Sequence, residues 1–293
     1  MLTPNSPNHF NPPRTYASSH RFNRLIDVTE PLLGAVRASS LIWTPIDIED
    51  PDGGKYTLWP HLPCVVSPDE MRPHFTFGSI AFLASSEDLW RWKEELKEDE
   101  ANPGAHVAAA SASGTTLGRY LSDLHGLGLE NVHIPDPEPI RLLNDEDKRN
   151  PRLFALEPSS DDLDWADLMI RHATQASSTS NFLALIGTSR RWKKLRASSI
   201  SRLEHHEGID PMMGAAAASA SAWWSEEQRS WTQDLTMERD RRLASRLRGA
   251  LRSVRKTGSD EGILVPIHQA RLNGFAEALS MWPECEECEE AVF

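Results

Sequence analysis

The spacing of apolar positions predicts a strand–helix–strand unit near the start of the chain. Residues 14–20 (RTYASSH) have the pattern of a short strand that ends at His20. Residues 21–38 place apolar side chains at helical spacing. Residues 40–48 (SLIWTPIDI) are almost continuously apolar, which is typical of a strand covered on both faces. Pro45 weakens this strand because proline has no N–H to donate to a neighbour. The three segments together predict a βαβ unit.

The end of the chain repeats this arrangement. A helix is predicted from about residue 225 to 255, a strand over 262–267 (GILVPI) and a final helix over 269–282. His268 follows the last strand as His20 follows the first. Ligand sites of open α/β sheets form at the carboxyl ends of strands. We therefore expect the first and last strands to lie in one sheet and the two histidines to meet in a cleft. The alternative is that each histidine only caps a helix or faces solvent.

The middle of the chain has a more helical pattern. Strands are predicted over 55–62 and 74–83, and helices over 85–100, 115–128, 159–176 and 180–197. We interpret residues 101–114 and 211–224 as low-complexity connectors, and residues 135–162 as a long surface segment rich in proline and charge. Residues 1–13 are expected to form a loose arm, and residues 284–293 an acidic, mobile tail.

These elements predict an α/β (or α+β) fold. Its central mixed sheet brings the N- and C-terminal strands together and is flanked by helices. A single domain over 14–283 is expected to carry a largely helical insertion at about 86–222.

Composition narrows the class of protein. The 293 residues carry a formal net charge of -12, so a nucleic acid is not the expected partner, because its phosphates require a basic surface. Three cysteines do not form a disulfide framework. The first residues lack the basic and apolar regions of a secretory signal. No uninterrupted apolar run approaches the about 18 residues that suggest a membrane span. The sequence therefore predicts a cytoplasmic protein.

Two charged residues fall on the apolar side of the helix at 225–255. At 100° per residue, Arg239 and Asp240 lie within the arc formed by Leu243, Leu247 and Leu251. A charge on a buried face is costly unless it is paired or used. Either the two form a buried pair that holds the helix, or Arg239 reaches into the cleft of the histidines.

At these residues the sequence resembles the TraB/Tiki superfamily, which includes the erythromycin-esterase and ChaN-like proteins. A helix beginning Glu238-Arg239-Asp240, followed by a strand that ends at His268, is similar to the C-terminal signature of that family. The segments YASSH, RFNRLIDVTEPLLGAV and LIWTPIDIED follow the order and spacing of its N-terminal half-signature. The resemblance covers about residues 14–50 and 226–281.

The resemblance implies a hydrolase with its site at the carboxyl ends of strands. It assigns His20 and His268 as metal ligands or acid/base groups, and Asp47 or Glu49 as the catalytic carboxylate. It assigns Arg239 to stabilise developing negative charge, and places Glu238 and Asp240 among the cofactor-binding candidates. The cofactor is not identified by the sequence, and a divalent metal is the candidate.

The sequence departs from the family pattern at three positions. Ala17 and Val265 replace the two motif glycines, and Pro45 stands where the glutamate of the family falls. A side chain in place of glycine narrows the space beside a bound group. The alternative is therefore a catalytically inactive relative that binds a small molecule, a peptide or a protein partner.

Other clusters are weaker candidates. Glu204 to Glu207 (EHHE) are neighbours that do not share a helix face, which favours a solvated turn. Cys285 and Cys288 form a single CxxC, whereas structural zinc usually needs four ligands. The basic residues around Trp192 are interpreted as a solvated helix face.

Overall fold

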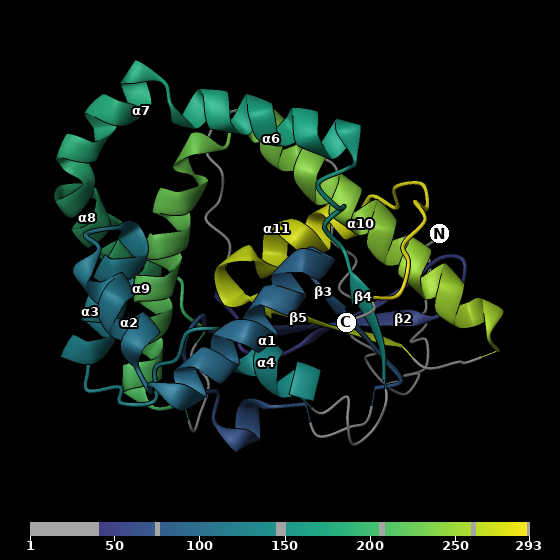
Figure 1. Ribbon diagram of the computed structural model, residues 1–293, viewed down its shortest axis with the longest axis horizontal. Helices are drawn as coiled ribbons and strands as arrows, with labels where there is room; N and C mark the ends of the chain where they lie inside the picture. The colour runs from purple at the N-terminus through teal and green to yellow at the C-terminus, as the bar shows by residue number, and fades with distance from the viewer. Residues whose placement is uncertain (1–40, 74–76, 145–150, 205–208, 259–261, 292–293) are drawn as a thin grey trace, which may run out of the picture. The chain divides into compact units, whose positions relative to one another are not determined.

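The computed structural model describes residues 41–73, 77–144, 151–204, 209–258 and 262–291 (Figure 1). These residues belong to one compact unit of the chain, residues 38–293. The predicted N-terminal arm, the strand at 14–20 with His20, and the helix at 21–38 lie outside the described residues. The expected pairing of the first and last strands therefore stays a prediction.

The fold is α/β, as predicted, and is built on a five-stranded mixed sheet in the order β1-β2-β5-β3-β4. β2 (Lys55–His61), β5 (Ile263–His268), β3 (Ser79–Phe82) and β4 (Arg152–Ala155) run parallel. Only β1 (Ile46–Glu49) is antiparallel to its neighbour, β2. The carboxyl ends of the four parallel strands therefore meet at one edge of the sheet.

The central strands are buried on both faces, which explains their nearly continuous apolar sequences. Every residue of β5 from Ile263 to Ile267 is buried. The proline in this strand, Pro266, lies beyond the part of β5 that pairs with β3, since that pairing ends at Leu264. The missing N–H of Pro266 therefore breaks no bond to β3. Because β3 and β5 separate here, the sheet opens at its carboxyl edge.

The first apolar segment differs from the prediction. The strand begins only at Ile46, after Pro45, and its burial alternates between half-buried and exposed. β1 is thus an edge strand rather than a strand covered on both faces. Proline has no N–H to donate to a neighbouring strand. It is tolerated just before an edge strand because no ladder hydrogen bond is needed from that position.

Helices cover both faces of the sheet (Figure 1). One face packs its apolar side chains against α6, α10 and α11, and the other packs against α1 and α4. A third cluster joins α3, α8 and α9 to the segment that follows β2. The helices are α1 (Ser86–Ala101), α2 (Ala105–Ala112), α3 (Thr116–Gly126), α4 (Pro137–Asn144), α6 (Leu163–Ala176), α7 (Thr179–Ala184), α8 (Thr188–Ile200), α9 (Pro211–Glu227), α10 (Gln233–Lys256) and α11 (Gln269–Ser280).

Both segments interpreted as connectors are helical. Residues 105–112 form α2, and residues 211–227 form α9, whose alanines are largely buried. α9 begins with Asp210 as its N-cap and Pro211 in its first turn, and alanine has the highest helix propensity of any residue. The interpretation failed because a run of alanines has no amphipathic period, whereas its small side chains suit a helix packed on several sides.

Two other segments are more ordered than expected. Residues 135–162 contain α4 and the buried strand β4 rather than a surface segment. The acidic tail packs onto the sheet: Cys288 is buried, and the Ala291 N–H donates to the carbonyl of Leu153. Within the described part of the chain, no helix combines the length and the apolar character needed to cross a bilayer.

Candidate metal centre

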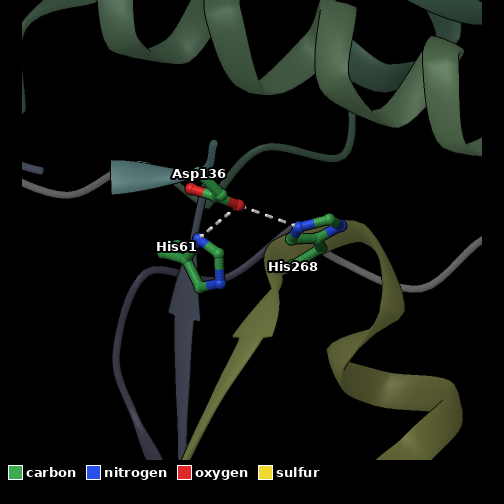
Figure 2. A group of neighbouring side chains, drawn as sticks. All are labelled: His61, Asp136 and His268. Atoms are coloured by element: carbon green, nitrogen blue, oxygen red, sulfur yellow. Dashed lines mark hydrogen bonds and ion pairs between the residues drawn. The ribbon is translucent and has the colours of Figure 1, made fainter. Parts of the chain in front are cut away.

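Three potential metal ligands converge at the carboxyl edge of the sheet (Figure 2). Asp136 Oδ2 lies 3.1 Å from His268 Nε2 and 3.6 Å from His61 Nδ1. The imidazole rings of the two histidines are 5.1 Å apart and meet edge to face. One donor atom from each residue falls within 4.8 Å of the others. The three side chains thus surround a small volume from three sides.

Strand register brings the two histidines together. His61 ends β2, His268 ends β5, and the two residues are direct partners in the parallel pairing of these strands. Parallel neighbours lie about 4.8 Å apart, so side chains at paired end positions are adjacent. Figure 2 shows both imidazoles rising from the ends of the two arrows.

Asp136 comes from the segment that returns to this edge before α4. The His133 N–H donates to the carbonyl of Cys64, and the Val66 N–H donates to the carbonyl of Asn131. These bonds fix the segment to the chain that follows β2 and bring Asp136 over the histidines. The second carboxylate oxygen, Oδ1, is buried without a hydrogen-bond partner among the described residues. A buried carboxylate oxygen with a free lone pair is costly unless a cation or donor fills the site.

Burial controls the charge of His61. The residue is only 4% exposed, and burial lowers the pKa of its imidazole although the nearby Asp136 carboxylate opposes this effect. A neutral imidazole offers a nitrogen lone pair, which is the form that binds metals. Two imidazoles and one carboxylate form a donor set typical of catalytic zinc and of other first-row metals. Zinc ligands of this kind lie about 3.3 Å apart, from a metal–ligand distance of about 2.0–2.1 Å and tetrahedral geometry. Two of the three separations are close to this value.

The three residues line a cavity of about 280 Å³ where the sheet opens between β3 and β5. Glu95 from α1 and Arg271 from α11 are the other charged residues of its lining. The remaining wall is mainly apolar and includes Phe82, Leu83, Trp92, Ile134, Trp223 and Pro266. The cavity is therefore mainly apolar with a few charged groups in its lining, a pattern common in small-molecule sites.

Arg239 lies beside this pocket and not in its lining. Its Nε donates to Asp240 at 2.9 Å, and the two residues are each 6% exposed, so the predicted buried face of this helix is confirmed. The Arg239 guanidinium also lies over Trp224, a tryptophan whose ring meets His268 edge to face. Asp240 in turn accepts a hydrogen bond from Arg271. Arg239 and Asp240 thus support the pocket through Trp224 and Arg271.

The three acidic candidates other than Asp240 lie elsewhere. Glu238 is half exposed and pairs with Arg171, because one step along a helix turns a side chain by about 100°. Asp47 accepts a hydrogen bond from Thr57, and Glu49 pairs with Lys55 in the sheet register. Thr57, which contacts Asp47, precedes His61 by four residues, or about 13 Å along β2. Asp47 therefore lies away from the two histidines.

The antiparallel direction of β1 explains the misplacement of Asp47 and Glu49. The prediction assumed a parallel strand, whose end would lie beside His268. Because β1 runs the other way, its carboxyl end lies at the opposite edge of the sheet. The carboxylate at the centre is Asp136 instead.

Sequence reasoning missed two of the three candidate ligands. His61 ends a strand that was predicted over 55–62, so the strand-end rule that selected His268 also applies to it. Asp136 gave no such signal, because it lies in a proline-rich segment that was interpreted as surface. His20 lies outside the described residues.

No family model matches the chain, and neither the curated proteins nor the solved structures compared with it include a match. The resemblance to the TraB/Tiki superfamily therefore remains a prediction. The candidate site is defined by the geometry of His61, Asp136 and His268 at the carboxyl edge of the sheet.

Proposed function

We propose that this chain is a divergent, metal-dependent hydrolase of the TraB/Tiki type, with His61, Asp136 and His268 as its metal ligands. The observation that supports the proposal is the convergence of these three donors in the lining of one pocket, with one Asp136 oxygen that has no hydrogen-bond partner among the residues that the structure describes. His61 takes the role that the sequence assigned to His20.

The residues present fit a divalent ion and the chemistry of hydrolysis. When bound, such an ion acts as a Lewis acid toward water and a carbonyl oxygen. Glu95 lines the same cavity and is the candidate proton acceptor. The apolar wall limits bulk water in the pocket, and lower local polarity strengthens every charge interaction there.

The test is direct measurement of metal uptake. Protein stripped with a chelator is titrated with Zn²⁺ by calorimetry, and with Co²⁺ by absorption spectroscopy, which reports coordination. We expect one ion per chain, and a loss of affinity of about 100-fold or more in His268→Ala and in Asp136→Asn. His125→Ala, at an exposed histidine of α3, is the matched control and should bind as the parent does. Metal affinity that is unchanged in His268→Ala and in Asp136→Asn would refute the metal centre.

Turnover distinguishes the hydrolase from the alternative of a binding module. The metal-loaded parent is incubated with a panel of aryl esters and amides, and the metal-free protein is the blank. Metal-dependent hydrolysis lost in Glu95→Gln supports the hydrolase. Tight metal binding without turnover on any substrate favours a non-catalytic relative that uses the same pocket.

A further inference from the structure

One wall of the cavity is positively charged. Arg271 lies in the first turn of α11, three residues after His268, and lines the same cavity. His268 is the last residue of β5 and the N-cap of α11, and its side chain and that of Arg271 both contribute to the lining of this cavity. The Arg271 side chain is only 11% exposed. A ligand in this cavity therefore contacts both the candidate metal centre and Arg271.

The charge of Arg271 is only partly neutralised. Asp240 Oδ1 accepts hydrogen bonds from Arg271 Nη2 at 3.0 Å and from Arg239 Nε at 2.9 Å, so two guanidinium groups share one carboxylate oxygen. Arg271 Nε is buried with no hydrogen-bond partner among the described residues. A buried cation with an unsatisfied N–H is costly, and an anion beside it removes that cost.

A second carboxyl group, that of Glu157, neutralises the charge of the two arginines only in part. Glu157 follows β4 at the same edge of the sheet and interacts electrostatically with Arg271 and Arg239. Burial raises the pKa of Glu157 to about 7, so near neutral pH it carries roughly half of a negative charge. Two arginines thus face one full carboxylate and part of another. The two guanidinium groups are therefore not fully neutralised by these two carboxyl groups, and the positive charge that remains suits a monoanion.

The rest of the cavity determines the body of the ligand. Phe82, Leu83, Trp92, Ile134 and Trp223 form an apolar wall that disfavours a doubly charged group such as phosphate. The planar fork of a guanidinium matches the two oxygens of a carboxylate. The volume of about 280 Å³ is at the lower end of the size range of small-molecule sites.

We propose that the substrate of this pocket is a small carboxylate with an apolar body. Its carboxylate binds Arg271, and its hydrolysable bond lies against His61, Asp136 and His268. This substrate class rests on the proposed hydrolase function. The anion subsite at Arg271 does not depend on it and is tested in the absence of metal.

The test compares an acid with its neutral isostere. Binding of 3-phenylpropionate and of 3-phenylpropanamide is measured by calorimetry, first with metal-free protein and then with Zn²⁺-loaded protein. We expect the acid to bind metal-free parent at least about tenfold more tightly than the amide. Arg271→Gln should lose this preference and still bind the amide as the parent does. Arg252→Gln removes an exposed arginine of α10 and is the charge-matched control, which should keep the preference.

Each outcome decides one statement. Equal binding of acid and amide by the parent, or an acid preference that survives in Arg271→Gln, overturns the anion subsite. If Arg271→Gln does not fold, Arg271→Lys replaces it. The affinity of this variant for the acid should fall several-fold, while its affinity for the amide stays the same. A fall of both affinities, or of neither, overturns the inference. Zn²⁺ uptake is measured on the same samples. A parent that prefers the acid but binds no Zn²⁺ refutes the metal centre and leaves the anion subsite standing.

Discussion

At the scale of single residues, the environment of Glu157 shows how position changes chemistry. Its carboxyl group follows the end of β4, close to Arg271 in the pocket lining and to Arg239 beside the pocket. Burial raises its pKa from 4.5 to about 7, although Arg271 and Arg239 act in the opposite direction. Desolvation therefore outweighs the two neighbouring positive charges, and Glu157 titrates near neutral pH.

We expect Glu157→Gln to change how stability depends on pH. An acid whose pKa is raised by folding weakens the folded state as pH increases from the unfolded value of about 4.5 to the folded value of about 7. The variant lacks this loss, so its stability relative to the parent should rise by up to about 3 kcal/mol between pH 5 and pH 8. Urea unfolding at both pH values measures the change.

The control for this prediction is Glu100→Gln, at an exposed carboxyl of α1. It should leave the pH dependence of the parent unchanged. A constant difference between Glu157→Gln and the parent from pH 5 to pH 8 would contradict a shifted carboxyl at Glu157.

At the scale of elements, a buried ion pair attaches the first hairpin to the longest helix. Asp50, in the turn after β1, accepts hydrogen bonds from Arg248 Nε of α10 at 2.9 Å and from the Tyr56 hydroxyl of β2 at 2.6 Å. Burial alone would raise the pKa of Asp50, but these bonds hold it below its usual value. The carboxylate thus joins the β1–β2 hairpin to α10, since Arg248 lies 198 positions after Asp50 in the sequence.

We expect Asp50→Asn to destabilise the protein by about 3–5 kcal/mol at pH 7, because it leaves the buried Arg248 without its main partner. A carboxyl with a lowered folded pKa stabilises the protein above its unfolded value of about 3.8, and this stability is lost as pH falls through the folded value. The free energy of unfolding of Asp50→Asn should therefore fall less than that of the parent as the pH is lowered through this range. Asp52→Asn, whose carboxylate also pairs with Arg248 but is largely exposed, should cost less than about 1 kcal/mol. Equal effects of the two substitutions would show that burial of Asp50 is not the cause.

At the scale of the whole molecule, the end of the chain closes the fold against the helix that precedes β5. Gly249 of α10 contacts the tail so closely that a Cβ atom there would lie 1.7 Å from the carbonyl oxygen of Glu286. Arg242 and Arg246, which lie on the same helix as Gly249, form ion pairs with the Glu286 carboxylate of the tail. The acidic tail is therefore held by charge and by a glycine contact, and it covers the sheet at β4.

The Gly249→Ala substitution should displace this tail. Alanine favours a helix over glycine by about 1 kcal/mol, so on propensity alone the change would stabilise α10. The clash with the Glu286 carbonyl outweighs this gain. We therefore expect the protein to lose about 1–3 kcal/mol of stability and to be cleaved faster by proteases after residue 282. Gly274→Ala, in α11 with open space around it, is the matched control and should stabilise the protein. A stable Gly249→Ala variant with a protected tail would contradict this packing.

The sequence predicted those features that depend on local patterns. β5 and α11 were expected within a few residues of their bounds, and the helical arc placed Arg239 and Asp240 on a buried face. Each follows from the spacing of apolar side chains along one element. The strand-end rule selected His268 for the same reason, since an apolar run that stops at a polar residue marks the edge of a sheet.

Only the tertiary structure decided which groups meet at that edge. His61 and His268 are 207 positions apart in the sequence, and their pairing depends on β5 entering between β2 and β3. Asp47 and Glu49 were lost from the site because a strand of the same composition can run in either direction, and β1 runs antiparallel. Asp136 joins through backbone hydrogen bonds to residues that follow β2, which no local pattern reveals. The sequence by itself determined elements such as β5, α10 and α11 and selected one candidate ligand, His268, because these depend on neighbouring residues. The other two candidate ligands depend on contacts between distant segments: His61 on the strand order of the sheet, and Asp136 on hydrogen bonds between its segment and the residues that follow β2.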